Sequence, residues 1–186
     1  MTASTEGKPP LDMAALFPEI SVISDARLRE SVEAVWQELW QQSEYAAIGD
    51  VPSSPEIPYS HVVHNRAVLR MALAVADTFE SVHGLHVDRD VLLAAGLLQD
   101  VSKLVEYAPG GGLTALGSGY PHAFWAGHVA LQHGIPDAVV QIVLTHTPNS
   151  STFPASLEGK ILYYVDQLDV IAIHKDRWRK ELMITK

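Results

Sequence analysis

Apolar residues recur at three- and four-residue steps along most of the chain, which is the spacing of amphipathic helices. The first helix is predicted to begin after Asp25, whose side chain is placed to cap it, and to end near Ser43. Its apolar stripe consists of Leu28, Val32, Val35, Trp36, Leu39 and Trp40. Residues 1–24 combine three prolines with small polar residues and predict an extended or loosely docked N-terminal arm.

A segment rich in proline, glycine and serine, residues 49–58, follows the first helix. Such a sequence cannot continue a helix, so it predicts a loop that leads into the main body of the protein. The next helical stripe starts at His61 or His64 and runs to about Glu80, and Gly84 provides a stop for it.

The most apolar part of the chain lies within residues 91–107, VLLAAGLLQDVSKLVEY, and either Asp88 or Asp90 can cap a helix there. Its central part is apolar on all sides, so we expect this helix at the centre of the fold. The glycine-rich residues 108–120 end it. Their spacing matches neither a P-loop nor a dinucleotide fingerprint, and we interpret them as a flexible loop.

Three more helices are predicted towards the C-terminus. Pro121 suits a first helical turn, and residues 122–133 continue that helix. Residues 138–146 form the next, although their β-branched residues leave a strand open as an alternative. The last helix runs from about Ser156 through residue 176.

The fold class predicted from these elements is all-α, because no alternating strand pattern and no internal repeat is found. The length of 186 residues is that of one ordinary domain. We expect an N-terminal arm over residues 1–24 and one helical domain over residues 25–186, with its core at residues 59–176.

Charge and hydropathy exclude several classes of partner. Thirteen basic against 22 acidic side chains give a net charge of −9, which argues against stable nucleic-acid binding. The longest apolar run, from Val91 to Leu98, is far shorter than the roughly 20 residues that span a bilayer, so we expect no membrane segment. The N-terminal sequence lacks the pattern of a secretory signal, and we expect a cytoplasmic protein.

The absence of cysteine means that a metal ion would need histidine, carboxylate or neutral oxygen ligands. Asp100 follows the run LLAAGLL after one intervening residue, Gln99, and Asp166 lies within ILYYVDQL. A carboxylate buried among such neighbours needs a cation or hydrogen-bond donors to offset its desolvation. The candidate ligands, from different predicted helices, are His64, Gln99, Asp100, His122, His146 and Asp166.

These residues lie in segments that resemble the HD superfamily of metal-dependent phosphohydrolases. HNRAVLRMALAVA (64–76), LLQDVSK (97–103) and YYVDQLD (163–169) are similar to the family's three conserved segments, the second of which usually reads LLHDxxK. HAFWAGHVA (122–130) and VVQIVLTHTP (139–148) match the two additional histidines of its two-metal branch. In layout and length the chain resembles the HD-type hydrolases of symmetric dinucleoside tetraphosphates.

The resemblance implies an HD-type helical bundle with an N-terminal extension and two divalent metal ions, of Mn, Fe, Mg, Ni or Zn. It implies that His64, Asp100 and Asp166 hold one ion, and that Asp100 bridges to a second ion completed by His122 and His146. Metal-bound hydroxide would then hydrolyse a phosphoester or phosphoanhydride bond of a small phosphorylated substrate such as a nucleotide. A homodimer is left open.

Two further residues are candidates for catalysis. Lys103 lies three residues after Asp100, on nearly the same helical face, and is placed to reach a substrate phosphate; a surface lysine is the alternative. His61 lies one helical turn before His64, where a proton donor to the leaving oxygen is useful. A surface histidine at the start of a helix is the alternative for His61.

The chain departs from the family at Gln99, where the HD motif has its histidine. An amide oxygen is a poorer ligand than an imidazole for zinc, iron or nickel, although magnesium and manganese accept it. Three functions therefore stay open: a hydrolase with a weakened site, an iron-dependent oxygenase of the HD type, and a catalytically degenerate HD domain that binds a ligand.

Overall fold

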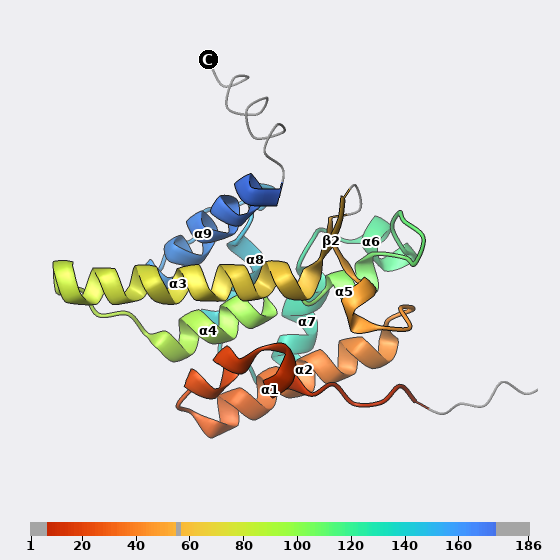
Figure 1. The fold of residues 1–186 in the computed structure, drawn as a ribbon, viewed down its shortest axis with the longest axis horizontal. Helices are drawn as coiled ribbons and strands as arrows, with labels where there is room; N and C mark the ends of the chain where they lie inside the picture. Colours follow the sequence, from red (N-terminus) through yellow and green to blue (C-terminus); the bar gives the residue numbers. More distant parts are fainter. Residues whose placement is uncertain (1–6, 55–56, 174–186) are drawn as a thin grey trace, which may run out of the picture.

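The computed structural model places one short buried helix, α4, at the centre of the molecule (Figure 1). It describes residues 7–54 and 57–173. The elements are α1 (Met13–Leu16), η1 (Pro18–Val22), α2 (Ala26–Gln42), η2 (Ile48–Asp50), β1 (Pro52–Ser54), β2 (Ile57–Ser60), α3 (His61–His83), α4 (Arg89–Leu98), α5 (Lys103–Glu106), α6 (Ala115–Gly119), α7 (Phe124–Gln132), α8 (Asp137–Thr145) and α9 (Leu157–Ile173). Helix α4 packs against α2, α3, α8 and α9, which confirms the prediction of a central helix.

The α-helical prediction is confirmed for the described part of the chain, in which the one sheet is the pair β1 and β2. The long helix α3 ends at Gly84, which takes the left-handed conformation with φ of 65°. Residues 137–145 form a helix in spite of their β-branched residues. Helix α9 is described to Ile173, so its predicted continuation to residue 176 lies outside the described residues.

The central helix ends earlier than the sequence predicts. Asp88 caps its start by accepting a hydrogen bond from the Val91 amide at 3.0 Å. At its end the hydrogen bonds become those of tight turns, as in the bond from the Lys103 amide to the Asp100 carbonyl at 3.0 Å. The predicted helix over residues 91–107 is therefore two helices joined by a turn, and Asp100 lies in that turn.

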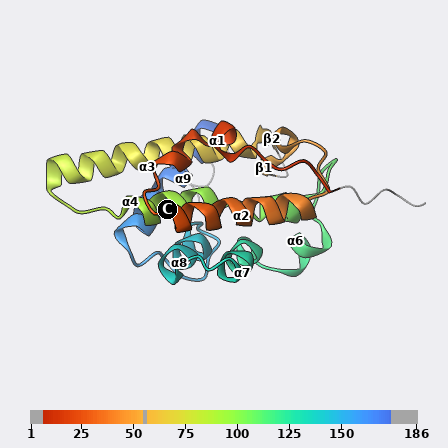
Figure 2. The same cartoon turned by 90° about the horizontal axis from the view of Figure 1, so that it is seen from below.

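The N-terminal arm is neither extended nor loosely docked from residue 13 onward. It forms α1 and η1, and the side chains of Phe17 and Ile23 are fully buried. The Phe17 ring lies 4.9 Å from the ring of Trp36 on α2. Figure 2 shows this segment running alongside the helices rather than away from them. The apolar residues of this segment therefore complete the core.

Two other segments differ from the prediction. The loop predicted at residues 49–58 overlaps the antiparallel strand pair β1 and β2, whose strands are too short to give an alternating pattern. Helix α7 begins at Phe124 rather than directly after Pro121, because Ala123 has φ of 65°. His122 thus precedes the helix in a turn. Within the described ranges, no helix has both the length and the apolarity needed to cross a membrane.

Candidate metal centre

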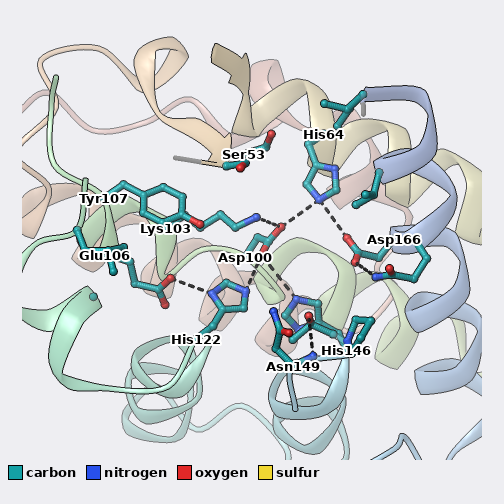
Figure 3. A pocket seen from close by; sticks show the side chains of 18 residues that line it. Ser53, His64, Asp100, Lys103, Glu106, Tyr107, His122, His146, Asn149 and Asp166 are labelled. Atoms are coloured by element: carbon teal, nitrogen blue, oxygen red, sulfur yellow. Dashed lines mark hydrogen bonds and ion pairs between the residues drawn. The ribbon is translucent and has the colours of Figure 1, made fainter. Parts of the chain in front are cut away.

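A cavity of about 460 Å³ opens where α3 and α9 meet the turn after α4 and the segments before α7 and after α8 (Figure 3). Six residues predicted for the site line it: His64, Asp100, Lys103, His122, His146 and Asp166. The other walls come from β1, the Tyr107–Gly117 segment and the residues after His146. The structure therefore brings together side chains that span about 100 positions of the sequence.

Asp100 is the centre of this arrangement, as Figure 3 shows. Its Oδ2 lies 3.0 Å from Nε2 of His64 and 2.7 Å from Nζ of Lys103. Its Oδ1 lies 3.1 Å from Nε2 of His122 and 3.6 Å from Nε2 of His146. The turn after α4 directs this carboxylate into the cavity, and each histidine turns the same ring nitrogen towards it.

The side chains form two groups suited to a metal ion, each with its ligand atoms within 4.8 Å of one another. One group is His64, Asp100 and Asp166, in which Nε2 of His64 also lies 3.1 Å from the Asp166 carboxylate. The other group is Asp100, His122 and His146. Both groups share Asp100. The first offers two carboxylates and one histidine, whereas the second offers one carboxylate and two histidines.

The proximity of these side chains changes their pKa values strongly. Burial alone would raise the pKa of Asp100, but the Lys103 ammonium and hydrogen bonds from the three histidines bring it well below its usual range. Burial opposes protonation of His122, yet its bonds to Asp100 and Glu106 raise its pKa to about 9. Similarly, three carboxylates raise the pKa of His64 well above its usual value. The cavity thus holds a carboxylate that is charged over the whole neutral range.

The histidines are also held from behind. Nδ1 of His64 donates to Asp169 at 2.7 Å, and Nδ1 of His122 donates to Glu106 at 2.8 Å. Both carboxylates are almost fully buried. The sequence analysis missed both residues, although Asp169 stands in the quoted segment YYVDQLD and Glu106 follows Lys103 by three residues in the apolar run.

His146 is held differently, because its Nδ1 donates to the backbone carbonyl of Val143 at 2.7 Å. That carbonyl belongs to α8, so the end of the helix fixes the ring. In every histidine of the two groups, Nδ1 is therefore held by a partner other than Asp100, and Nε2 is directed at Asp100. A metal ligand of this kind has its ring orientation and tautomer set by the partner on its other nitrogen.

Lys103 lies in the first turn of α5 and is 8% exposed. Its ammonium group pairs with Asp100 at the wall of the cavity. The sequence-based prediction that Lys103 and Asp100 share a face agrees with this contact, and the alternative of a surface lysine is wrong.

His61 lies outside the set of residues that line the cavity. It is completely buried, and its ring stacks on Trp36 with centroids 5.5 Å apart. Its burial lowers the pKa to about 3, so the imidazole is neutral at pH 7. The alternative of a surface histidine is therefore wrong. The role of His61 as a proton donor to the leaving oxygen stays a prediction.

The comparisons with known proteins give one informative match. No family model matches the chain, and no solved structure matches it. The chain is 31% identical over 117 residues to the dihydroneopterin 2',3'-cyclic phosphate phosphodiesterase of Methanocaldococcus jannaschii. The match covers 58% of this chain and 45% of that protein, so the chain spans less than half the length of this relative.

The donor set is chemically suited to divalent cations. Histidine nitrogens and carboxylate oxygens without thiolate are ligands for manganese, iron, nickel, zinc and, where oxygen dominates, magnesium. Gln99 adds a buried amide whose Oε1 and Nε2 both lack a hydrogen-bond partner. Gln99 is not among the residues that line the cavity. Its predicted place among the metal ligands thus stays a prediction.

Proposed function

We propose that this protein is an HD-type phosphohydrolase that cleaves a phosphoester or phosphoanhydride bond of a small, nucleotide-sized substrate with the help of two divalent cations. The observation that carries the proposal is the buried Asp100 carboxylate, which two three-residue groups share at the wall of a cavity. The relative named as a cyclic phosphate phosphodiesterase supports the same class of chemistry.

The two groups of residues would each hold one cation. His64, Asp100 and Asp166 would hold one cation, and Asp100 with His122 and His146 the other. Cations at these positions supply a lowered pKa for water and neutralise charge on a phosphoryl oxygen.

Lys103 contributes a fixed positive charge on the same wall of the cavity. We assign it to a non-bridging oxygen of the substrate phosphate, since an ammonium group binds phosphate as a point charge.

Elemental analysis of protein purified without chelator, combined with hydrolysis of bis(p-nitrophenyl) phosphate and a dinucleoside tetraphosphate, tests the proposal. We expect about two equivalents of metal and a turnover that chelator abolishes and Mn²⁺ restores. Asp100→Ala should lose bound metal and reduce turnover at least ~100-fold with unchanged circular dichroism, because it removes the shared ligand. Asp137→Ala, at an exposed position on α8, is the matched control.

Three results would contradict the proposal. Full metal content in Asp100→Ala would show that the carboxylate does not hold the cations. Iron-dependent oxygen uptake without hydrolysis would indicate an oxygenase. Binding of nucleotide without turnover, in protein that carries its metal, would indicate a ligand-binding module.

A further inference from the structure

The two groups of ligands share a feature on their outer side. One histidine in each group has a buried carboxylate behind it, Asp169 for His64 and Glu106 for His122. We infer that Asp169 and Glu106 are positioning residues, one for each half of the centre, that hold these rings with Nε2 directed at the metal position. This inference rests on the proposed metal centre and extends it to two residues that do not touch the shared carboxylate.

Glu106 holds both a ring and a backbone. Its Oε2 accepts from Nδ1 of His122 at 2.8 Å, and its Oε1 accepts from the amide of Ala123 at 3.2 Å. Ala123 has a positive φ, the one non-glycine residue of the described chain with this conformation. A residue in this region costs on the order of 1 kcal/mol or more, so the turn persists because its surroundings hold it. Glu106 thus fixes the turn that keeps His122 out of α7 and over the cavity.

The backbone of Glu106 is itself fixed by the segment after the glycine-rich loop. The Thr114 amide donates to the Glu106 carbonyl at 2.9 Å. An added Cβ at Gly117 would lie 2.2 Å from the same carbonyl oxygen, so α6 packs directly on Glu106. The glycine-rich segment 108–120 therefore anchors Glu106, and through it His122.

Asp169 does the same for the other half from α9. It lies one helical turn after Asp166, so a single helix supplies both a carboxylate for Nε2 of His64 and one for its Nδ1. His64 is almost completely buried between them. Losing Asp169 would leave the ring free to rotate, whereas losing Glu106 would affect a ring on the opposite side of Asp100.

Zinc titration calorimetry on the metal-free, full-length protein tests this division. We expect Glu106→Ala and Asp169→Ala each to weaken one of two bound zinc ions by 10- to 100-fold, the usual effect of removing such a partner, and to leave the other ion within about twofold. In a His146→Ala background the one complete group is His64, Asp100 and Asp166. There, Asp169→Ala should weaken zinc binding and Glu106→Ala should not. Glu106→Gln and Asp169→Asn, which keep an acceptor oxygen, should lose less than the alanine variants.

Glu38→Ala is the control, since Glu38 also accepts from a histidine, Nε2 of His133 at 2.7 Å, but outside the cavity. It should leave both zinc affinities unchanged, and circular dichroism of each metal-free variant verifies folding. Equal weakening of both ions, or none, in the alanine variants would overturn the inference, as would a wild-type protein that binds no zinc. Two zinc ions bound by wild type without hydrolysis would count against the proposed function alone.

Discussion

Gln99 combines complete burial with an amide whose two polar atoms have no partner. Leaving such groups unpaired costs about 1–3 kcal/mol. We therefore expect Gln99→Met, which has nearly the same shape, to raise the free energy of unfolding of the metal-free protein by about 1–2 kcal/mol in urea denaturation.

Gln99→His, compared with Gln99→Met, tests whether residue 99 can bind metal. An imidazole is a better metal ligand than an amide, so the metal affinity of the group around His64 should rise by at least ~10-fold, with no such gain in Gln99→Met. Calorimetry with Mn²⁺ or Zn²⁺ measures both. If Gln99→His bound metal no better than wild type, residue 99 would not be a metal ligand.

His61 is a buried base whose pKa of about 3 lies below its unfolded value of 6.5. Between these values the unfolded chain binds a proton that the folded protein excludes. The contribution of His61 to the free energy of unfolding is therefore fully present above pH 6.5. It is lost as the pH falls towards 3, by up to ~1.4 kcal/mol per pH unit. In urea titrations with chelator, His61→Gln should flatten the slope of stability between pH 6 and 4.5. An unchanged slope would mean that His61 is already protonated when folded.

The sequence was informative about residues whose environment can be read locally. Asp100 and Asp166 stand out because their neighbours in the sequence are apolar, which requires these carboxylates to be buried. Asp169 and Glu106 could not be found in that way, since each is defined by a histidine remote in sequence; Asp169 and His64 are 105 positions apart. The burial of His61 against Trp36 likewise depends on α2, which the local pattern around residue 61 does not contain.

At the scale of elements, α6 and α5 are in direct contact through Gly117. An added Cβ there would lie 2.2 Å from the Glu106 carbonyl oxygen, whereas one at Gly119 in the same helix would meet nothing within 4 Å. Gly117→Ala should therefore destabilise the protein by about 1–3 kcal/mol and also weaken metal binding, while Gly119→Ala should change stability by less than ~0.5 kcal/mol. Thermal unfolding and zinc calorimetry of both variants check this, and equal behaviour of the two would contradict the contact.

Helix starts marked by an aspartate cap, and the helical class of every long element, could be predicted from the sequence. Asp25 and Asp88 both accept hydrogen bonds from the first turn as expected. The break after α4 could not be predicted, because residues 99–102 keep helix-compatible side chains. Similarly, the positive φ of Ala123 depends on a glutamate 17 positions earlier.

At the scale of the whole molecule, the N-terminal segment is part of the core. The ring of Trp36 contacts the rings of both Phe17 and His61, and its Nε1 donates to the Leu97 carbonyl at 3.0 Å. Phe17→Ala should cost ~3–5 kcal/mol, as expected for a fully buried aromatic ring. Phe153→Ala, whose side chain is 52% exposed, should cost less than ~1 kcal/mol. Similar midpoints of urea unfolding for the two variants would contradict the docking of this segment.

The order of the ligands along the chain has a consequence for biosynthesis. They are made in the order His64, Asp100, His122, His146 and Asp166. Chains grow from the N-terminus and fold progressively as they emerge from the ribosome. A nascent chain that ends after α8 already contains the complete nitrogen-rich group, whereas His64, although made first, waits for α9 to supply Asp166 and Asp169. The two halves of the centre would therefore mature in sequence, and the half that starts earliest on the chain would be the last to capture its ion.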